Sequence, residues 1–209
     1  EEVGHAIDDF LKVKDSAGDE GAIFSALVRG ESLSPSQWEA LKVEDDSTTL
    51  VIYGNPLIVE QATFTVSNTN DNGAGSLGQA IINANSASGA DIINFDGSLS
   101  GDTITLTSGE LKITDDLTIN GLGADQLTID ADGNSRVFNI DDEDEESAIA
   151  VTLKGLTITG GTVTEERGGG ILNRENLTLT NSTVSGNSAE FSGGGISNGG
   201  NLTLSKSRV

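Results

Sequence analysis

The segment that decides the fold, residues 168–209, reads GGGILNRENLTLTNSTVSGNSAEFSGGGISNGGNLTLSKSRV. Within it, GGGILN at 168–173 returns as GGGISN at 193–198, and NLTL at 176–179 returns unchanged at 201–204. Both pairs are offset by 25 residues (193 − 168 and 201 − 176). A fixed period of this length is typical of solenoids, in which each repeat forms one turn of a coil.

The period has a direct physical interpretation. Three short strands and three bends use about 25 residues, and stacked turns place successive strands about 4.8 Å apart in a parallel ladder. Gly169 and Gly194 are expected to stack at one bend, where backbones approach closely or need positive φ. Asn173 and Asn198 are expected to stack as a ladder in which the amides hydrogen-bond along the column.

The same pattern extends backwards through the chain. Short triplets alternate apolar, polar and apolar residues, so that one face is buried and the other is solvated. The 27 Gly and the low aromatic content of 4% fit a narrow core of small aliphatic side chains. Triplets of this kind lie at 104–106, 111–113, 117–119, 127–129 and 156–158.

These observations predict a mainly β protein, a right-handed parallel β-helix with a small N-terminal helical region. Residues 1–46 are expected to be helical from the spacing of their apolar residues. Residues 47–62 are interpreted as a β-hairpin linker. Residues 63–209 are expected to form the β-helix, with a capping helix near 76–85 that begins at Ser76.

The charge of the chain excludes some classes of partner. With 33 acidic and 11 basic side chains, the net charge of −22 argues against binding to nucleic acid or to an anionic membrane. No apolar run reaches the length of a membrane span, so no membrane insertion is expected. The absence of Cys fits an exported protein without disulfides, although it does not separate the cytosol from the exterior.

The repeat and the segment before it resemble a known family. GGGI(L/S)N followed by NLTL resembles the right-handed parallel β-helix repeats of bacterial surface proteins, including polymorphic outer-membrane-protein and adhesin-like repeats. The segment FTVSNTNDNGAGSLGQAIINAN at 64–85 is similar to the start of such β-helices, where a strand and a short helix close the first coil. The resemblance implies a bacterial cell-surface or extracellular location. It says little of activity, because this fold carries lyases, hydrolases, adhesins and passive fibres.

The first residues resemble a degenerate zinc-peptidase helix. EEVGH at 1–5 has Glu1 where the peptidase motif has its first His, and it keeps His5 at the second ligand position. Glu20 or Asp19 would supply a third zinc ligand. The alternative is a helical relic of a peptidase-like region that binds no metal.

A first candidate calcium site lies in the predicted turn before the capping helix. The turn matches the first half of a calcium loop, but Gln79 stands at the twelfth position, where a bidentate Glu is expected. The alternative is an Asx-rich turn without a metal. The candidate ligands are Asn68, Asn70, Asp71 and Asn72.

Two further acidic segments are candidates for calcium. Asp130 and Asp132 belong to the turn DADGN, and residues 141–146 read DDEDEE. The alternative for the acidic run is a solvated loop that bulges from one coil. No catalytic residue is assigned from the sequence, and no cofactor is expected other than calcium.

The sequence favours a non-enzymatic structural or adhesive β-solenoid. The last repeat stops at Val209 within a coil, and we interpret the chain as a processed or truncated piece, or as a unit that associates end to end, head to tail, into filaments. Polysaccharide or other surface proteins are the remaining expected partners. The alternatives are a polysaccharide-binding or polysaccharide-cleaving β-helix, which a groove with carboxylates and a basic residue would favour, and a metal-binding relic of a zinc peptidase.

Overall fold

The computed structural model describes residues 47–52, 55–144 and 147–209, so the predicted helical region 1–46 lies outside the described residues. The contacts divide the chain into two units. In the first, β1 (Ser47–Ile52) and β2 (Asn55–Glu60) pair antiparallel as a hairpin. No helix in the described part of the chain is long and apolar enough to cross a membrane.

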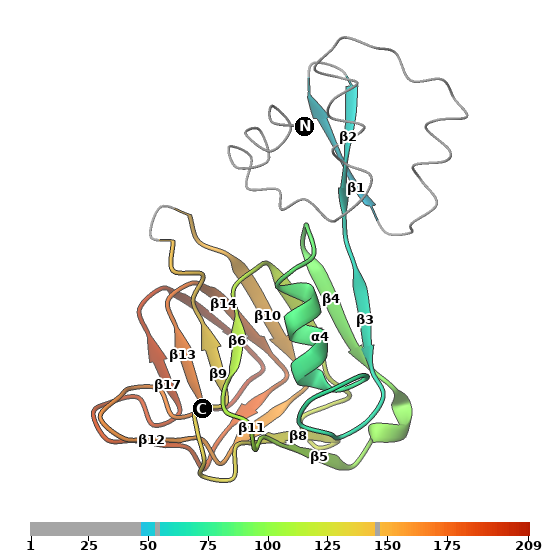
Figure 1. The fold of residues 1–209 in the computed structure, drawn as a ribbon. Coiled ribbons are helices and arrows are strands. Elements are labelled where there is room, and N and C mark those ends of the chain that lie inside the picture. Colours follow the sequence, from blue (N-terminus) through green and yellow to red (C-terminus); the bar gives the residue numbers. More distant parts are fainter. Residues whose placement is uncertain (1–46, 53–54, 145–146) are drawn as a thin grey trace. The chain divides into compact units, whose positions relative to one another are not determined.

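The second unit is a parallel β-solenoid, which confirms the fold class predicted from the sequence (Figure 1). Three sheets form its walls, and successive strands of each sheet belong to successive coils. The first sheet contains, in spatial order, β18 (Asn201–Ser205), β14 (Asn176–Thr180), β10 (Ala150–Lys154), β7 (Leu117–Asn120), β4 (Asp91–Phe95) and β3 (Thr63–Val66).

The other two walls are four-stranded. The second sheet contains β15 (Thr183–Val184), β11 (Thr157–Thr159), β8 (Leu127–Asp130) and β5 (Asp102–Thr105). The third sheet contains β17 (Ile196–Asn198), β13 (Ile171–Asn173), β9 (Phe138–Ile140) and β6 (Leu111–Ile113). The remaining elements are the strand pair β12 (Thr162–Val163) and β16 (Ser188–Ala189), the helix α4 (Leu77–Ala84) and the 3₁₀ turn η1 (Gly97–Leu99).

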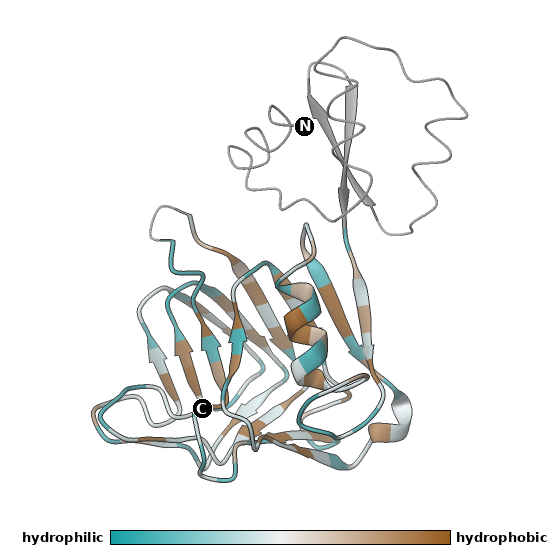
Figure 2. Ribbon diagram, viewed as in Figure 1, coloured by the Kyte–Doolittle hydropathy of each residue, from teal (hydrophilic) through white to brown (hydrophobic). Residues whose placement is uncertain are grey.

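The core is a set of aliphatic columns inside the tube. The register places Leu117, Val151, Leu177 and Leu202 in one column of the first sheet. Side chains in the inner coils are almost fully buried, and each contributes about 1.5–3 kcal/mol to folding. Figure 2 shows the resulting apolar bands, which alternate with polar bands along the strands.

The coils differ in length although their strands stay aligned. Residue 176 lies opposite 201, an offset of 25, and residue 150 lies opposite 176, an offset of 26. Residue 117 lies opposite 151, an offset of 34. The 25-residue period therefore holds for the last two coils and not for the whole stack. Most of the difference of eight residues (34 − 26) lies between β9 and β10, where nine residues (141–149) stand against two (174–175) in the next coil.

The triple-glycine segments stack at one bend. Gly168 has φ of 71° and Gly193 has φ of 67°, which is the left-handed region that favours glycine. The Gly169 N–H donates to the Gly193 carbonyl at 3.2 Å, and the Gly170 N–H donates to the Gly194 carbonyl at 3.0 Å. These bonds hold two coils at backbone contact distance.

A buried asparagine fixes the corner between the third and the first sheet. Asn173 is fully buried, and its Nδ2 donates to Asn198 Oδ1 at 2.6 Å and to the Glu175 carbonyl at 2.9 Å. Its Oδ1 accepts from the Glu175 N–H at 3.2 Å. On the next coil, Asn198 Nδ2 donates to the Gly200 carbonyl at 2.7 Å. The two amides thus repeat one turn-closing geometry and are joined along the stack.

Helix α4 closes the N-terminal side of the stack. Ser76 caps it by accepting from the Gln79 N–H, and its buried residues 77, 80, 81 and 84 form one face. Asn85, just after the helix, donates from Nδ2 to the Lys112 carbonyl at 2.8 Å and accepts from the Thr114 N–H at 3.0 Å. The asparagine therefore takes the place of a neighbouring strand along the outer edge of β6.

A buried arginine braces three coils. Arg136 is only 3% exposed, and its guanidinium is paired with the carboxylates of Glu110 and Glu166. Its Nε also donates to the Gly168 carbonyl at 2.9 Å, and Nη2 donates to the Arg167 carbonyl at 3.0 Å. Removal of one partner would leave a buried charge, so this network fixes the coils relative to one another.

The stacked bend predicts an asymmetric response to alanine. A Cβ at Gly169 would overlap the Ser188 carbonyl and lie 2.8 Å from the Gly194 oxygen, whereas a Cβ at Gly97 meets nothing within 4 Å. We expect Gly169→Ala to lower the free energy of unfolding by about 1–3 kcal/mol because rigid backbone must move. Gly97→Ala should stay within about 0.5 kcal/mol of the wild type. Urea unfolding followed by circular dichroism measures both, and equal losses would contradict the assigned packing.

Candidate functional site

The longest insertion in the stack carries the acidic run. It spans residues 141–149, between the end of β9 and the start of β10, where the next coil has only residues 174 and 175. The expectation of a loop that bulges from one coil therefore describes its position. Residues 145–146 lie outside the described residues.

The first turn of this loop is shaped by its own carboxylates. Asp141 Oδ1 accepts from the Glu143 N–H at 3.0 Å, and Asp142 Oδ1 accepts from the Asp144 N–H at 2.8 Å. Such Asx turns give the backbone a local hydrogen-bond partner and allow Glu143 to adopt a positive φ of 65°. The turn positions the first two carboxylates beside the corner of the coil.

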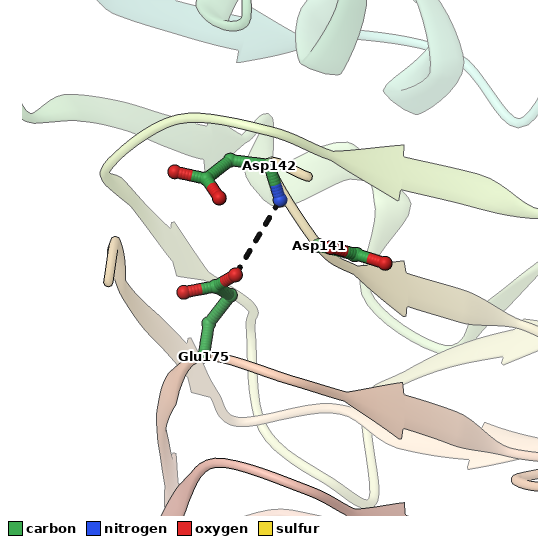
Figure 3. Close-up of side chains that lie close together, drawn as sticks. All are labelled: Asp141, Asp142 and Glu175. Atoms are coloured by element: carbon green, nitrogen blue, oxygen red, sulfur yellow. Dashed lines mark hydrogen bonds between the residues drawn. The ribbon is translucent and has the colours of Figure 1, made fainter. Parts of the chain in front are cut away.

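The third carboxylate comes from the following coil. Glu175 lies between β13 and β14 and is only 4% exposed. Its Oε2 accepts from the Ile149 N–H at 3.1 Å. Its Oε1 accepts from the Asp142 N–H at 3.5 Å, the bond drawn in Figure 3. One buried side chain therefore holds both ends of the inserted loop.

The result is a cluster of three carboxylates. One oxygen from each of Asp141, Asp142 and Glu175 lies within 4.8 Å of the others, and no second group of this kind occurs among the residues that the structure describes. Oxygen ligands at this spacing suit a hard cation such as Ca²⁺. We call these three residues the carboxylate cluster.

Electrostatics of the cluster favour a cation. Burial, and then the charge of Asp142, raise the pKa of Glu175 above its ordinary value of 4.5. Because the pKa of Glu175 is higher in the folded state than in the unfolded state, protonated Glu175 stabilises the fold. This contribution is fully present at pH values below the unfolded pKa. That contribution is lost as the pH rises through the folded pKa. A dication bound to the cluster would offset the repulsion between the ionised carboxylates of Glu175 and Asp142 at pH values above the folded pKa.

Two basic residues lie at the rim. Arg174 Nη1 is 3.2 Å from Asp141 Oδ2, and Lys112 Nζ is 2.6 Å from Glu143 Oε1. The hydrogen bond between Lys112 and Glu143 raises the pKa of the lysine and lowers that of the glutamate. Arg174, Lys112 and Glu143 are exposed, so these pairs contribute little to stability.

A pocket of about 540 Å³ opens beside the cluster. Its wall combines acidic groups with one guanidinium, and it is formed by the loop and the corners of the two following coils. The residues that line it are Asp141, Glu143, Asp144, Ser147, Ala148, Arg174, Glu175 and Gly199.

The calcium candidates in the turn before α4 do not belong to the carboxylate cluster. In the turn before α4, Asn68 Oδ1 accepts from the Asn70 N–H at 3.1 Å, and Asp71 Oδ2 accepts from the Thr107 hydroxyl at 2.8 Å. Asn72 is exposed, and Gln79 lies in the first turn of α4. The side chains of Asn68 and Asp71 therefore serve the turn and its contact with a neighbouring loop.

Asp130 and Asp132, two further calcium candidates from the sequence, lie at the end of β8 and in the turn after it. Asp130 Oδ1 accepts from the Asp132 N–H at 2.8 Å, in a turn where Asp132 has φ of 49°. This pair gains no third carboxylate within the described residues. The zinc candidates Glu1, His5 and Glu20 lie outside the described residues.

Sequence reasoning missed Glu175. The signal was present in the repeat, because ILNRENLTL at 171–179 aligns with ISNGGNLTL at 196–204 and places Glu175 opposite Gly200. A buried glutamate where the next coil has glycine is unusual unless it serves a partner. The partner, the inserted loop, lies about one coil away in sequence and could not be aligned with the repeat.

Comparisons with known proteins add no family or relative. No protein-family model matches the chain, and the comparisons with curated proteins and with solved structures found no match. The site is therefore interpreted from its own geometry.

The carboxylate cluster predicts stabilisation by calcium. At about ten times its dissociation constant, Ca²⁺ that binds only the folded state adds about 1.4 kcal/mol to the free energy of unfolding. Asp142→Asn keeps the acceptor for the Asp144 N–H and removes one charge, so we expect calcium to bind at least about tenfold more weakly. Thermal unfolding with and without CaCl₂ measures the effect.

Glu190→Gln is the matched control, because this exposed glutamate lies just after β16, outside the cluster. It should respond to calcium as the wild type does. An equal calcium response of the wild type and of Asp142→Asn would contradict the assignment of calcium to this cluster.

Proposed function

We propose that the chain is a structural and adhesive β-solenoid of a bacterial cell surface or extracellular matrix. The observation that carries the proposal is the repetition of one pattern up to the outermost strands of the stack. β18 pairs with β14 over five residues, and Leu202 and Leu204 continue the aliphatic columns of the inner coils. A structure that adds equivalent layers is suited to mechanical work and to presenting a repeated surface.

End-to-end association is part of this proposal. On the N-terminal side, Asn85 already pairs with the outer edge of β6, so a copy cannot pair its strand there without displacing this side chain. On the opposite side, β15, β17 and β18 are the outer strands of their sheets. On the N-terminal side, β5 is likewise the outer strand of the second sheet. Outer strands pair readily with another chain, so a head-to-tail contact joins the β15 side of one copy to the β5 side of the next.

The association is tested by sedimentation and electron microscopy of the purified chain at rising concentration. We expect oligomers that grow with concentration. Leu204, which is 48% exposed, points along a core column, so Leu204→Lys should abolish the association. Thr203→Lys, on the opposite face of the same strand, should preserve it. Dispersed monomers at every concentration would overturn the assembly.

A second function is favoured by the pocket beside the carboxylate cluster. It joins several carboxylates with Arg174 on one face of the stack, and this combination suits cleavage of an acidic polysaccharide. Calcium held by the cluster would neutralise a substrate carboxylate that the net charge of −22 otherwise repels. The exposed guanidinium of Arg174 would contact the substrate.

Incubation with polygalacturonate in calcium buffer tests this second function through the release of shorter oligosaccharides. If the pocket cleaves the polymer, we expect Arg174→Ala to reduce product formation at least about a hundredfold, as loss of a donor that stabilises developing negative charge does. Lys112→Ala, at the same rim but outside the residues that line the pocket, should retain it. No product from the wild type would rule out cleavage of this substrate.

A further inference from the structure

The outward face of the first sheet carries an aligned column of threonines. We call the outward side chains of β7, β10, β14 and β18 the threonine face. The register places Thr118, Thr152, Thr178 and Thr203 side by side on four successive strands. Because parallel strands lie about 4.8 Å apart, their hydroxyls form a row with the spacing of the strands.

Amide ladders flank this column on both sides. Asn120 Nδ2 donates to Asn94 Oδ1 at 3.1 Å on one side, and Asn201 Nδ2 donates to Asn176 Oδ1 at 2.7 Å on the other. Threonine is β-branched and has few side-chain conformations, and the bonded amides are also held in place. A ligand that binds here therefore loses little free energy to ordering of the protein.

The face is almost uncharged within a strongly acidic chain. Lys154 is its only charged residue, although the chain carries a net charge of −22. Polyanions would meet the repulsive field of the whole chain, while a neutral polymer would not. The members of the face are Thr118, Asn120, Ala150, Thr152, Lys154, Asn176, Thr178, Thr180, Asn201, Thr203 and Ser205.

The face also lacks the anchors of a protein interface. The large exposed apolar side chains of the described residues are Ile82, Phe191, Leu204 and Val209. None of them belongs to the threonine face, since Leu204 continues a core column. Protein partners usually dock through aromatic and aliphatic anchors in a dry centre. A wetted array of hydroxyl and amide groups matches a hydroxyl-rich ligand better.

We propose that the threonine face binds a neutral polysaccharide. Successive sugar hydroxyls exchange hydrogen bonds with successive coils, so that each coil adds an equivalent contact to the same chain of sugars. The proposal rests on the structural and adhesive role proposed above and names the partner of the adhesive surface. It concerns a different part of the solenoid from the carboxylate cluster and does not need calcium.

Retention of the purified chain on insoluble cellulose, chitin and curdlan tests the proposal, with polygalacturonate-coated beads as the anionic comparison. We expect retention on at least one neutral polymer and none on the anionic beads in the absence of calcium. Retention should stay unchanged between about 0.1 M and 1 M NaCl, where the Debye length falls from about 10 to about 3 Å, because no ion pair is involved.

Paired variants localise the binding. Thr152→Glu with Thr178→Glu places two charges at the centre of the face and should weaken binding to the neutral polymer at least about tenfold. Thr103→Glu with Thr128→Glu introduces the same pair at aligned positions of the second sheet and should leave binding unchanged. Both pairs place like charges opposite each other, so the cost to folding is matched.

A variant with Thr152→Ala and Thr178→Ala removes the hydroxyls without adding charge and should also weaken binding, which covers the case in which the charged pair fails to fold. Absence of retention on every neutral polymer, retention confined to the anionic beads, or equal losses in the two charged pairs would overturn the proposal. If the chain forms oligomers but is retained on no neutral polymer, only this inference is wrong. If the chain is retained on a neutral polymer but stays monomeric, only the proposed end-to-end assembly is wrong.

Discussion

Register between parallel strands is the constraint on which the rest of this structure depends. Each coil can bury its aliphatic side chains only if they align with those of the coils on either side, because a slip of one residue would turn every apolar side chain outward. Gly169 and Asn173 secure this alignment at two different places, one through close backbone contact and the other through an amide that closes a turn and reaches the next coil. The sheets, the corners and the surface columns all follow from it.

The fold could be predicted from the sequence because its signals are local and repeated. The glycine bend and the Asn173–Asn198 column were visible as residues that recur at one offset. The carboxylate cluster could not be predicted in the same way, since it joins Glu175 to a loop whose coil is longer than its neighbours. Asn68 resembles a calcium ligand in sequence, and in the structure its side-chain oxygen accepts the Asn70 N–H.

Acidic and neutral surfaces are separated in this chain by the preferences of the backbone. Asp and Glu are poor strand formers, so they collect at turns and corners, whereas threonine suits the solvated side of a strand. Asp130 at the end of β8, Asp141 after β9 and Glu175 before β14 follow this rule. The strands of the first sheet are left with hydroxyl and amide groups. A strongly acidic chain can thus present one surface for cations and another that is almost neutral.

The corner between β9 and β10 holds seven more residues than the same corner of the next coil (nine at 141–149 against two at 174–175), yet the strands on either side remain aligned. Length at this corner is therefore uncoupled from the integrity of the tube. Mutations can change the length or the charge of one such corner without repacking the interior. A new binding site can therefore arise in one coil while the other coils stay unchanged. The same property makes this corner a natural position for grafting a foreign peptide, which the coils would display beside a rigid wall.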